Sequence, residues 1–485
     1  MKQGPFAYPL GPRATPLRGP WALLLLALAI TASFLASSGP VQWMDNGMFL
    51  ADASIGRYFS ETLGPLDHPL YQFFNTAVFE LFGTQVLSLL NSILLLPLAA
   101  SLYWLAVNLG AQRNLAMLGA AVAVLAHAVF WVSTKAEVYL FHALFVIAAY
   151  ALYFERRGSL GAVSKLLLIG LFTGMAASIH QLTFIVLLPL YLRLLMEQRT
   201  RLLLTLPAFA LGFATAYPAM FNDLDSGLSL FQIARHYLTG ATPFESNPNW
   251  EGSMLRFDTM WHEKNSVALL CLSLLGPQLL GLLCYPKDSR LRLVWWALLL
   301  DFIFAASYNV NDRFTFFLPG ACFAAILGVL CLRQWLGNSR LASSVLLASV
   351  FCSPAALLFM WMLYCAGLVP LPVHAEALPY RNDIHYFMVP YLRDRSAEDF
   401  ARYYETSAPA GALIVSDWTP MGALRSAQAA GALQGRSFES CDNARDLSTY
   451  LKGAGAFLPR MSYCDSLTMR YKLEKLVVGY QLSSK

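Results

Sequence analysis

Residues 45–71 read DNGMFLADASIGRYFSETLGPLDHPLY and follow the first long apolar segment, residues 21–37, almost directly. This stretch gathers ionisable side chains in a chain that is otherwise mostly apolar: Asp45, Asp52, Arg57, Glu61, Asp67 and His68. Charged groups are rarely kept beside an apolar span without a reason, because removing them from water costs free energy. The function of the chain is therefore sought first in this polar stretch.

The composition predicts a polytopic membrane protein. Of the 485 residues, 57% are hydrophobic and only 13% are charged, with a mean hydropathy of +0.50. Soluble domains carry about 25% charged residues. The net charge of +5 comes from short Lys and Arg clusters between apolar runs. Such clusters encode membrane topology, and we expect no nucleic-acid partner.

The apolar segments predict about eleven transmembrane helices, since a span needs about 20 apolar residues. The segments are 21–37, 84–107, 115–132, 138–154, 166–179, 181–196, 202–220, 266–284, 293–309, 314–332 and 342–367. Basic residues fall in alternate loops, namely Arg113; Arg156, Arg157 and Lys165; Arg199 and Arg201; Lys287, Arg290 and Arg292; Arg333 and Arg340. The positive-inside rule then places the N-terminus in the cytoplasm, with an uncleaved first span, and the C-terminus on the opposite side.

This topology predicts two parts. Residues 1–367 form the transmembrane part, with a first outer loop at 38–83 and a long outer loop at 221–265. Residues 368–485 form a small extracytoplasmic domain. We expect an integral protein of a bacterial inner membrane whose C-terminal domain is periplasmic.

The C-terminal domain has the pattern of an α/β fold. We expect helices at 399–405, 421–430 and 442–451 and strands at 411–417 and 476–482, listed here by residue range. Cys441 and Cys464 share this domain on the oxidising side, where a disulfide forms readily. Neither the geometry nor the environment of the two thiols follows from the sequence, so the bonded and the free state both stay open.

Asp45 has two interpretations. A carboxylate at the membrane surface can take a proton from an acceptor hydroxyl. An Asp at this position can also cap the amphipathic interfacial helix that the spacing of Met48, Ala51 and Ile55 predicts. Asp67 and His68 follow a Gly-Pro break and can be either turn residues or site residues.

Further polar residues fall at predicted outer turns. Lys135 and Glu137 precede the fourth span, and His180 follows the fifth. Asp312 and Arg313 precede the tenth span and are most simply an interfacial ion pair. All of these can mark a membrane boundary, but a Lys there can also hold a phosphate as a point charge.

Asp301 lies in the middle of the ninth span, where an ionisable group suggests function. It supports an alternative function, that of a polytopic transporter or lipid flippase. Transporters tend to contain inverted repeats and interrupted helices at the midplane, which the sequence does not clearly contain. A non-catalytic scaffold whose outer domain binds a partner is a third possibility.

Three blocks of sequence resemble the multi-pass GT-C glycosyltransferases, with the protein O-mannosyltransferase-like branch the most similar. They are Asp45-Asn46-Gly47-x-Phe49 with Leu66-Asp67-His68-Pro69-Leu70-Tyr71, then Lys135-Ala136-Glu137-Val138-Tyr139, then Tyr308-x-Val310-x-Asp312-x6-Pro319. They cover most of the membrane part in order. The chain contains no Walker A, G-x-G-x-x-G, H-E-x-x-H or paired C-x-x-C motif.

The resemblance implies an enzyme that moves a sugar, mannose-like in the most similar branch, from a polyprenyl-phosphate donor to an acceptor hydroxyl with inversion. It implies Asp45 as the catalytic base. Acceptor and donor contacts would come from Asp67, His68, Lys135, Glu137, His180, Asp312 and Arg313, with Arg235 and Arg256 as further outer cations. The acceptor can be a protein, a lipid or a glycan. Asn46 stands where the family has a second acid, so no metal ligand set is expected.

Overall fold

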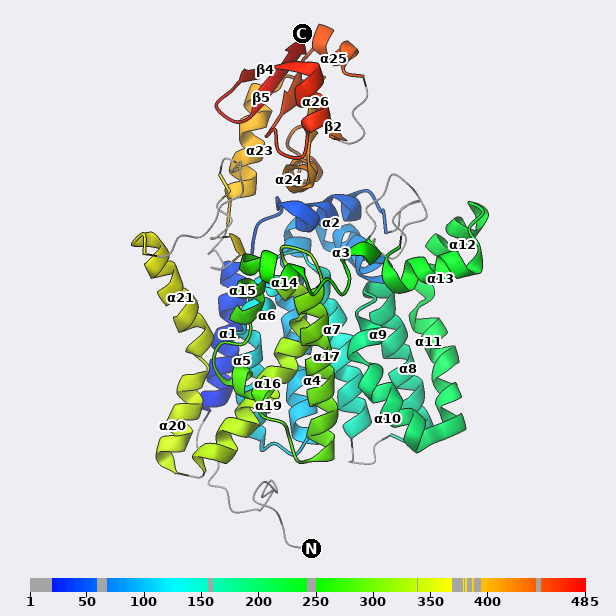
Figure 1. The fold of residues 1–485 in the computed structure, drawn as a ribbon, viewed down its shortest axis with the longest axis vertical. Helices are drawn as coiled ribbons and strands as arrows, with labels where there is room; N and C mark the ends of the chain where they lie inside the picture. The colour runs from blue at the N-terminus through cyan, green and yellow to red at the C-terminus, as the bar shows by residue number, and fades with distance from the viewer. Residues whose placement is uncertain are drawn as a thin grey trace, which may run out of the picture.

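The computed structural model describes residues 20–58, 68–155, 160–241, 250–337, 339–368, 378, 380–381, 386–387, 394–441 and 446–485. These form a helical bundle with a smaller domain against one of its ends (Figure 1). Helix α1 begins at Trp21 near the opposite end of the bundle.

Helices lie at all eleven segments predicted to span the membrane. They are α1 (Trp21–Ala36), α4 (Leu90–Asn108), α5 (Arg113–Val124) with α6 (His127–Ser133), α7 (Val138–Phe154), α8 (Ala162–Ile179), α9 (Thr183–Val186) with α10 (Leu188–Gln198), α11 (Thr205–Gly212), α15 (Lys264–Leu272) with α16 (Pro277–Leu283), α17 (Ser289–Ser307), α18 (Arg313–Phe316) with α19 (Leu318–Leu336), and α20 (Arg340–Ser349) with α21 (Cys352–Cys365).

These helices make the chain a membrane protein, although the number of spans depends on how broken helices are counted. Within the described residues, α4, α8 and α19 are each long and apolar enough to cross a bilayer. Four bent helix pairs raise this number to as many as seven, and α1 and α7 are shorter apolar helices. Eleven spans therefore stays a prediction.

The first predicted outer loop is more ordered than expected. It holds the expected interfacial helix, α2 (Met44–Ser54), and then α3 (Pro69–Ser88), which begins within the predicted loop 38–83. Pro69 favours a helix start because its fixed φ suits the first helical position. Helix α3 bends at Gly83, where φ is 77°.

The second predicted outer loop is also largely helical. Short helices connect α11 to α15: α12 (Tyr217–Asp225), α13 (Leu230–Thr239) and α14 (Thr259–His262), with the 3-10 turns η2 (Arg199–Leu204), η3 (Ala214–Ala216) and η4 (Trp250–Ser253) in this part of the chain. Helix α13 begins with a capping box between Ser229 and Gln232, a local signal that the sequence contains.

The C-terminal domain has the predicted α/β class. Its helices are α23 (Ser396–Ser407), α24 (Trp418–Ala429), α25 (Ser448–Lys452) and α26 (Asp465–Arg470), and its strands are β1 (Leu413–Ser416), β2 (Ser437–Ser440), β3 (Ala456–Leu458), β4 (Tyr471–Lys475) and β5 (Tyr480–Ser484). They form one sheet in the order β2-β1-β3-β5-β4, parallel among the first three strands and antiparallel at the other edge.

The two cysteines of this domain, Cys441 and Cys464, are bonded to each other as a disulfide. Both are buried beside the apolar side of the sheet. The disulfide that the sequence left open is therefore present.

Helix α24 is one of the elements that join this domain to the membrane part. It packs directly on α2, as Figure 1 shows. Ser426 of α24 accepts a hydrogen bond from the Gln42 backbone N–H at 3.1 Å, and the Gln42 side chain in turn accepts one from the Ala136 N–H at 3.0 Å. These contacts connect the C-terminal domain directly to the polar end of the bundle.

Candidate active site

The polar residues predicted from sequence lie at the end of the bundle that faces the C-terminal domain. Asp45 lies in the first turn of α2, but the N-cap of this helix is Trp43, and no side chain caps it. The capping interpretation of Asp45 is therefore wrong. Its carboxylate instead accepts a hydrogen bond from the indole N–H of Trp418, at the start of α24.

Glu137 lies in the turn before α7 and is buried. Its side chain accepts a hydrogen bond from the backbone N–H of Val138 at 3.2 Å, so it caps α7. Its own carbonyl accepts a hydrogen bond from the amide of Asn91 at 2.6 Å. These contacts fix the orientation of Glu137 at the polar end of the bundle.

Asp45, Glu137 and Asp312 come from three separate elements and influence one another electrostatically. Burial, and then the carboxylates of Asp45 and Asp312, raises the pKa of Glu137 well above its usual value. Burial and the Asp45 carboxylate also raise the pKa of Asp312 to about 6. Burial raises the pKa of Asp45, and the hydrogen bond from Trp418 opposes that rise. Grouped carboxylates with raised pKa values are typical of acid–base sites.

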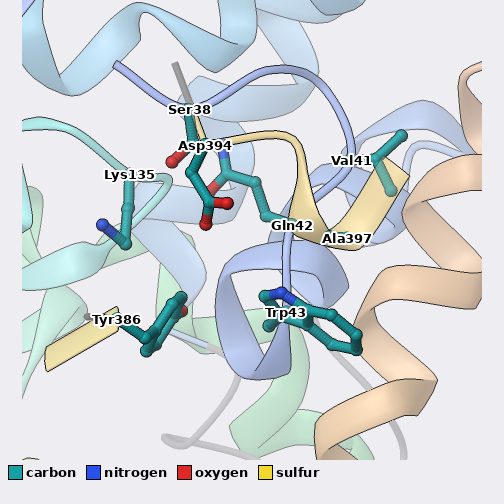
Figure 2. A pocket seen from close by; sticks show the side chains of 8 residues that line it. All are labelled: Ser38, Val41, Gln42, Trp43, Lys135, Tyr386, Asp394 and Ala397. Atoms are coloured by element: carbon teal, nitrogen blue, oxygen red, sulfur yellow. The ribbon is translucent and has the colours of Figure 1, made fainter. Parts of the chain in front are cut away.

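Lys135 is a buried cation of this region, with 2% of its surface exposed. Its ammonium lies 4.7 Å from the centre of the Trp131 ring and 5.2 Å from that of Tyr386. Burial lowers the pKa of Lys135 to about 8, although Asp394 and Glu137 oppose this shift. Lys135, Tyr386 and Asp394 line a small recess together with Trp43 (Figure 2).

Two residues of the segment between the membrane part and the C-terminal domain belong to this region: Tyr386 lines the recess, and Arg381 packs on Tyr386. The guanidinium of Arg381 lies 4.6 Å from the ring centre of Tyr386, on which Lys135 also packs. The Tyr386 hydroxyl donates a hydrogen bond to the side-chain oxygen of Asn46 at 2.7 Å. Asn46 donates in turn to the carbonyl of Ala136 at 2.8 Å. Sequence reasoning missed Arg381 and Tyr386, because no local pattern distinguishes them.

His68 and His180 stack on each other, with ring centres 5.4 Å apart. Nδ1 of His68 donates to the carbonyl of Ile179 at 2.6 Å, whereas Nδ1 of His180 accepts from the Leu182 N–H at 3.0 Å. In the neutral rings, Nε2 of His68 is therefore an acceptor and Nε2 of His180 a donor. Burial lowers the pKa of His68 to about 4 and lowers that of His180 too, so both are neutral at pH 7.

His180 also contacts the ring of Tyr139, at 5.2 Å between centres. Tyr139 belongs to the same sequence block as Lys135 and Glu137. The histidine pair therefore adjoins the carboxylate group instead of forming a separate site.

Other predicted residues lie in different surroundings. Arg313 donates to the carbonyls of Ala306 at 2.7 Å and Val310 at 3.3 Å, so it caps the end of α17. The predicted interfacial pair of Asp312 with Arg313 is not among the ion pairs of the described residues. Asp67 lies outside the described residues.

Arg235 and Arg256 are bound to acidic neighbours. Arg235 pairs with Glu251, and Arg256 pairs with Asp258 at 2.8 Å, and all four side chains are substantially exposed. Both cations are thus already neutralised at the surface. Asp301 is buried within α17 and accepts a hydrogen bond from the backbone N–H of Gly320 at 2.7 Å, which joins α17 to the start of α19.

The arrangement of these groups allows proton transfer and anion binding at one place. Within the described parts of the chain, no group of three or more His, Cys, Asp or Glu side chains has a geometry suited to a metal ion. The available chemistry is that of carboxylates, one buried lysine, an arginine on an aromatic ring and two neutral imidazoles.

Comparison with solved structures identifies the fold. The chain is similar to ArnT from Cupriavidus metallidurans bound to undecaprenyl phosphate, with a TM-score of 0.56 at 12% sequence identity over 95% of this chain and 97% of that one. The apo state of the same protein gives a TM-score of 0.55 at 13% identity over the same shares. Arabinofuranosyltransferase AftD from Mycobacteria gives 0.45 at 15% identity, over 88% of this chain and 34% of that one.

No protein-family profile and no curated protein matches the sequence. The two ArnT structures therefore supply the fold, over nearly the whole chain.

Proposed function

We propose that this protein is an integral-membrane glycosyltransferase that moves a sugar from a polyprenyl phosphate to an acceptor hydroxyl. The observation that carries the proposal is the convergence of Asp45, Glu137 and Asp312 near the buried Lys135, at the end of the bundle that holds the C-terminal domain. The fold supports it, because ArnT has this fold and its structure contains undecaprenyl phosphate.

In the proposed reaction, the acceptor oxygen attacks the anomeric carbon of the donor sugar. Asp45 takes the proton of the acceptor hydroxyl as a general base. The bond between the anomeric carbon and the phosphate oxygen breaks, and its electron pair leaves with the polyprenyl phosphate. A single displacement of this kind inverts the anomeric centre, as the sequence blocks imply.

The departing phosphate needs a positive or hydrogen-bonding partner. We assign Lys135 to neutralise the charge of this phosphate. We assign the Nε2–H of His180 to donate a hydrogen bond to one of the phosphate oxygens. His68 contributes its stacked ring to the same wall. Asp67 stays assigned from the sequence blocks alone. Arg313 is the weakest of the assigned cations, because it caps α17.

A lipid donor explains why the enzyme is built from membrane helices, since the polyprenyl tail stays in the bilayer. The finer assignments rest on the sequence blocks. They are a mannose-like sugar and the protein O-mannosyltransferase-like branch, with a protein, lipid or glycan as the acceptor. The basic residues in alternate loops support a topology with the C-terminal domain outside the cytoplasm, as in a bacterial inner membrane.

The test is a transfer assay with the purified full chain in proteoliposomes. Polyprenyl phosphates carrying different radiolabelled sugars are offered with a membrane extract as the acceptor source. We expect label to leave the lipid donor and free polyprenyl phosphate to accumulate, and neither to occur with Asp45→Asn. Release of label by Asp45→Asn at the wild-type rate would exclude the assignment of the base. No release with any donor would exclude the function.

A further inference from the structure

The C-terminal domain contributes a side chain to the proposed catalytic centre. Trp418 is the first residue of α24, and its indole N–H donates to Oδ1 of Asp45. The two residues are 373 positions apart in the chain and belong to different domains. Large apolar side chains are usually buried, yet 51% of the Trp418 surface is exposed. This indole therefore reaches out of its own domain to the carboxylate.

The local structure holds Trp418 in this place from both sides. Within the C-terminal domain, the Asp417 carboxylate caps α24 by accepting a hydrogen bond from the backbone N–H of Thr419 at 3.1 Å. The same carboxylate binds Arg460 in a buried bidentate ion pair, at 2.6 and 2.8 Å. On the other side, α24 lies across α2, which carries Asp45. The start of α24 is thus fixed both to the sheet and to the membrane part.

We propose that Trp418 is a positioning residue for the Asp45 base: its N–H holds one carboxylate oxygen so that the other faces the acceptor hydroxyl. This inference rests on the proposed function, and it assigns to the C-terminal domain a part in the chemical step. The indole N–H is a donor only, so it binds the ionised carboxylate and cannot itself take the proton.

Several charged groups surround Asp45, and the Trp418 N–H must be considered together with them. The acidic groups nearest this part of the site are Glu137, before α7, and Asp312, before α18, and the Asp45 carboxylate raises the pKa of each. On α2 itself, Asp52 pairs with Arg57, at 3.8 Å. In the connecting segment, the guanidinium of Arg381 lies 3.3 Å from the sulfur atom of Met44. On α24, Arg425 interacts with Asp52. Trp418 is the group that hydrogen-bonds to the carboxylate of Asp45.

The first experiment compares the pH dependence of kcat/KM for the wild type and Trp418→Phe, which keeps an aromatic ring but removes the N–H. We expect the acid limb to move up by about one pH unit, because a hydrogen bond to a charged group favours the ionised form. At the pH of maximal activity, below the alkaline limb, kcat/KM should fall less than at pH 6. Trp261→Phe is the matched control, since Trp261 is a largely exposed indole on α14. A uniform loss at every pH would overturn the proposal.

The second experiment needs no activity. The 11 tryptophans are replaced by 5-fluorotryptophan in the full chain in detergent micelles, and ¹⁹F NMR spectra are recorded against pH. The resonance that disappears in Trp418→Phe should titrate in the wild type and lose that titration in Asp45→Asn. A Trp418 resonance that titrates identically in Asp45→Asn would overturn the proposal. If the resonance behaves as expected while no donor is turned over, the contact stands and the proposed function fails.

Discussion

A Cβ atom on Gly47 would lie only 2.2 Å from the carbonyl oxygen of Gly422, so α2 and α24 cross at a point that glycine alone allows. A Cβ on Gly422 would lie 2.1 Å from the carbonyl of Met44. Both close neighbours are backbone atoms, which cannot rotate away as a side-chain end can. This crossing sets the position of the C-terminal domain over Asp45.

Gly422→Ala should displace α24 from α2. Overpacking of a tight contact costs about 1–3 kcal/mol. We expect a lower midpoint of thermal unfolding in detergent, together with reduced sugar transfer. Gly161→Ala is the control, because no atom lies near the position of its Cβ. Equal stability of the two variants would mean that the crossing tolerates a methyl group.

Asp45→Asn should reduce transfer by at least about 100-fold, the usual contribution of a general base. Asn retains the shape of Asp and an oxygen for the Trp418 N–H, so the unfolding midpoint should change little. The measurement is initial transfer rate and thermal unfolding on the same preparation. An active variant of normal stability would remove Asp45 from the mechanism.

Lys135 should control the alkaline side of the pH profile. The pKa of Lys135 is about 8, so its charge is present below this pH and is lost as the pH rises through it. Donor binding should therefore weaken above about pH 8, seen as a rising KM for the lipid donor. Lys135→Arg should move this limb to higher pH, while Lys135→Met should raise KM below about pH 8 and converge with the wild type above it. A KM that does not change with pH in the wild type would contradict this role.

The disulfide between Cys441 and Cys464 should stabilise the C-terminal domain by about 3 kcal/mol, given the 23-residue separation and a chain-entropy account. Cys464→Ser, or treatment with a reductant, should lower the unfolding midpoint. Cys271→Ser serves as the control, because Cys271 is a free, exposed cysteine of α15. The same loss in both variants would point to a general effect of removing a thiol.

Asp301 should prove structural. Its carboxylate accepts the backbone N–H of Gly320, and Asn retains an oxygen for that bond. Asp301→Asn should therefore keep most of the transfer activity, whereas Asp301→Ala leaves a buried donor unpaired and should cost about 1–3 kcal/mol of stability. Solute uptake by vesicles that Asp301→Asn abolishes and Asp45→Asn leaves intact would instead support a transporter.

The sequence predicted elements whose signal is local. The apolar segments became helices because an apolar run of this length has one stable form in a bilayer, with its backbone hydrogen bonds satisfied internally. Helices α23 and α24 and strand β1 were expected from periodicity. Strands β2, β3 and β4 were not predicted. Strands β2 and β4 lie at the sheet edges with a weak pattern of burial, and β3 is buried but only three residues long.

The candidate site could be predicted only in part. Asp45, Lys135, Glu137, His180 and Asp312 were found because polar groups next to apolar spans are conspicuous. Their surroundings were not found, since these depend on contacts between distant parts of the chain. Trp418 and Tyr386 reach the site from the C-terminal side, and no local pattern encodes the place where a chain folds back. The same holds for Arg313. The sequence predicts an ion pair with Asp312, but in the structure Arg313 donates to a carbonyl at the end of α17.

The long separation between Asp45 and Trp418 has a consequence for biosynthesis. Asp45 follows the first membrane helix and is made early, while Trp418 is made after all of the membrane helices. During translation the nascent chain therefore holds the acid for a long time before the indole that contacts it exists. A ribosome that stalls after the membrane helices but before α24 therefore leaves a membrane part in which Asp45 lacks the contact that positions it.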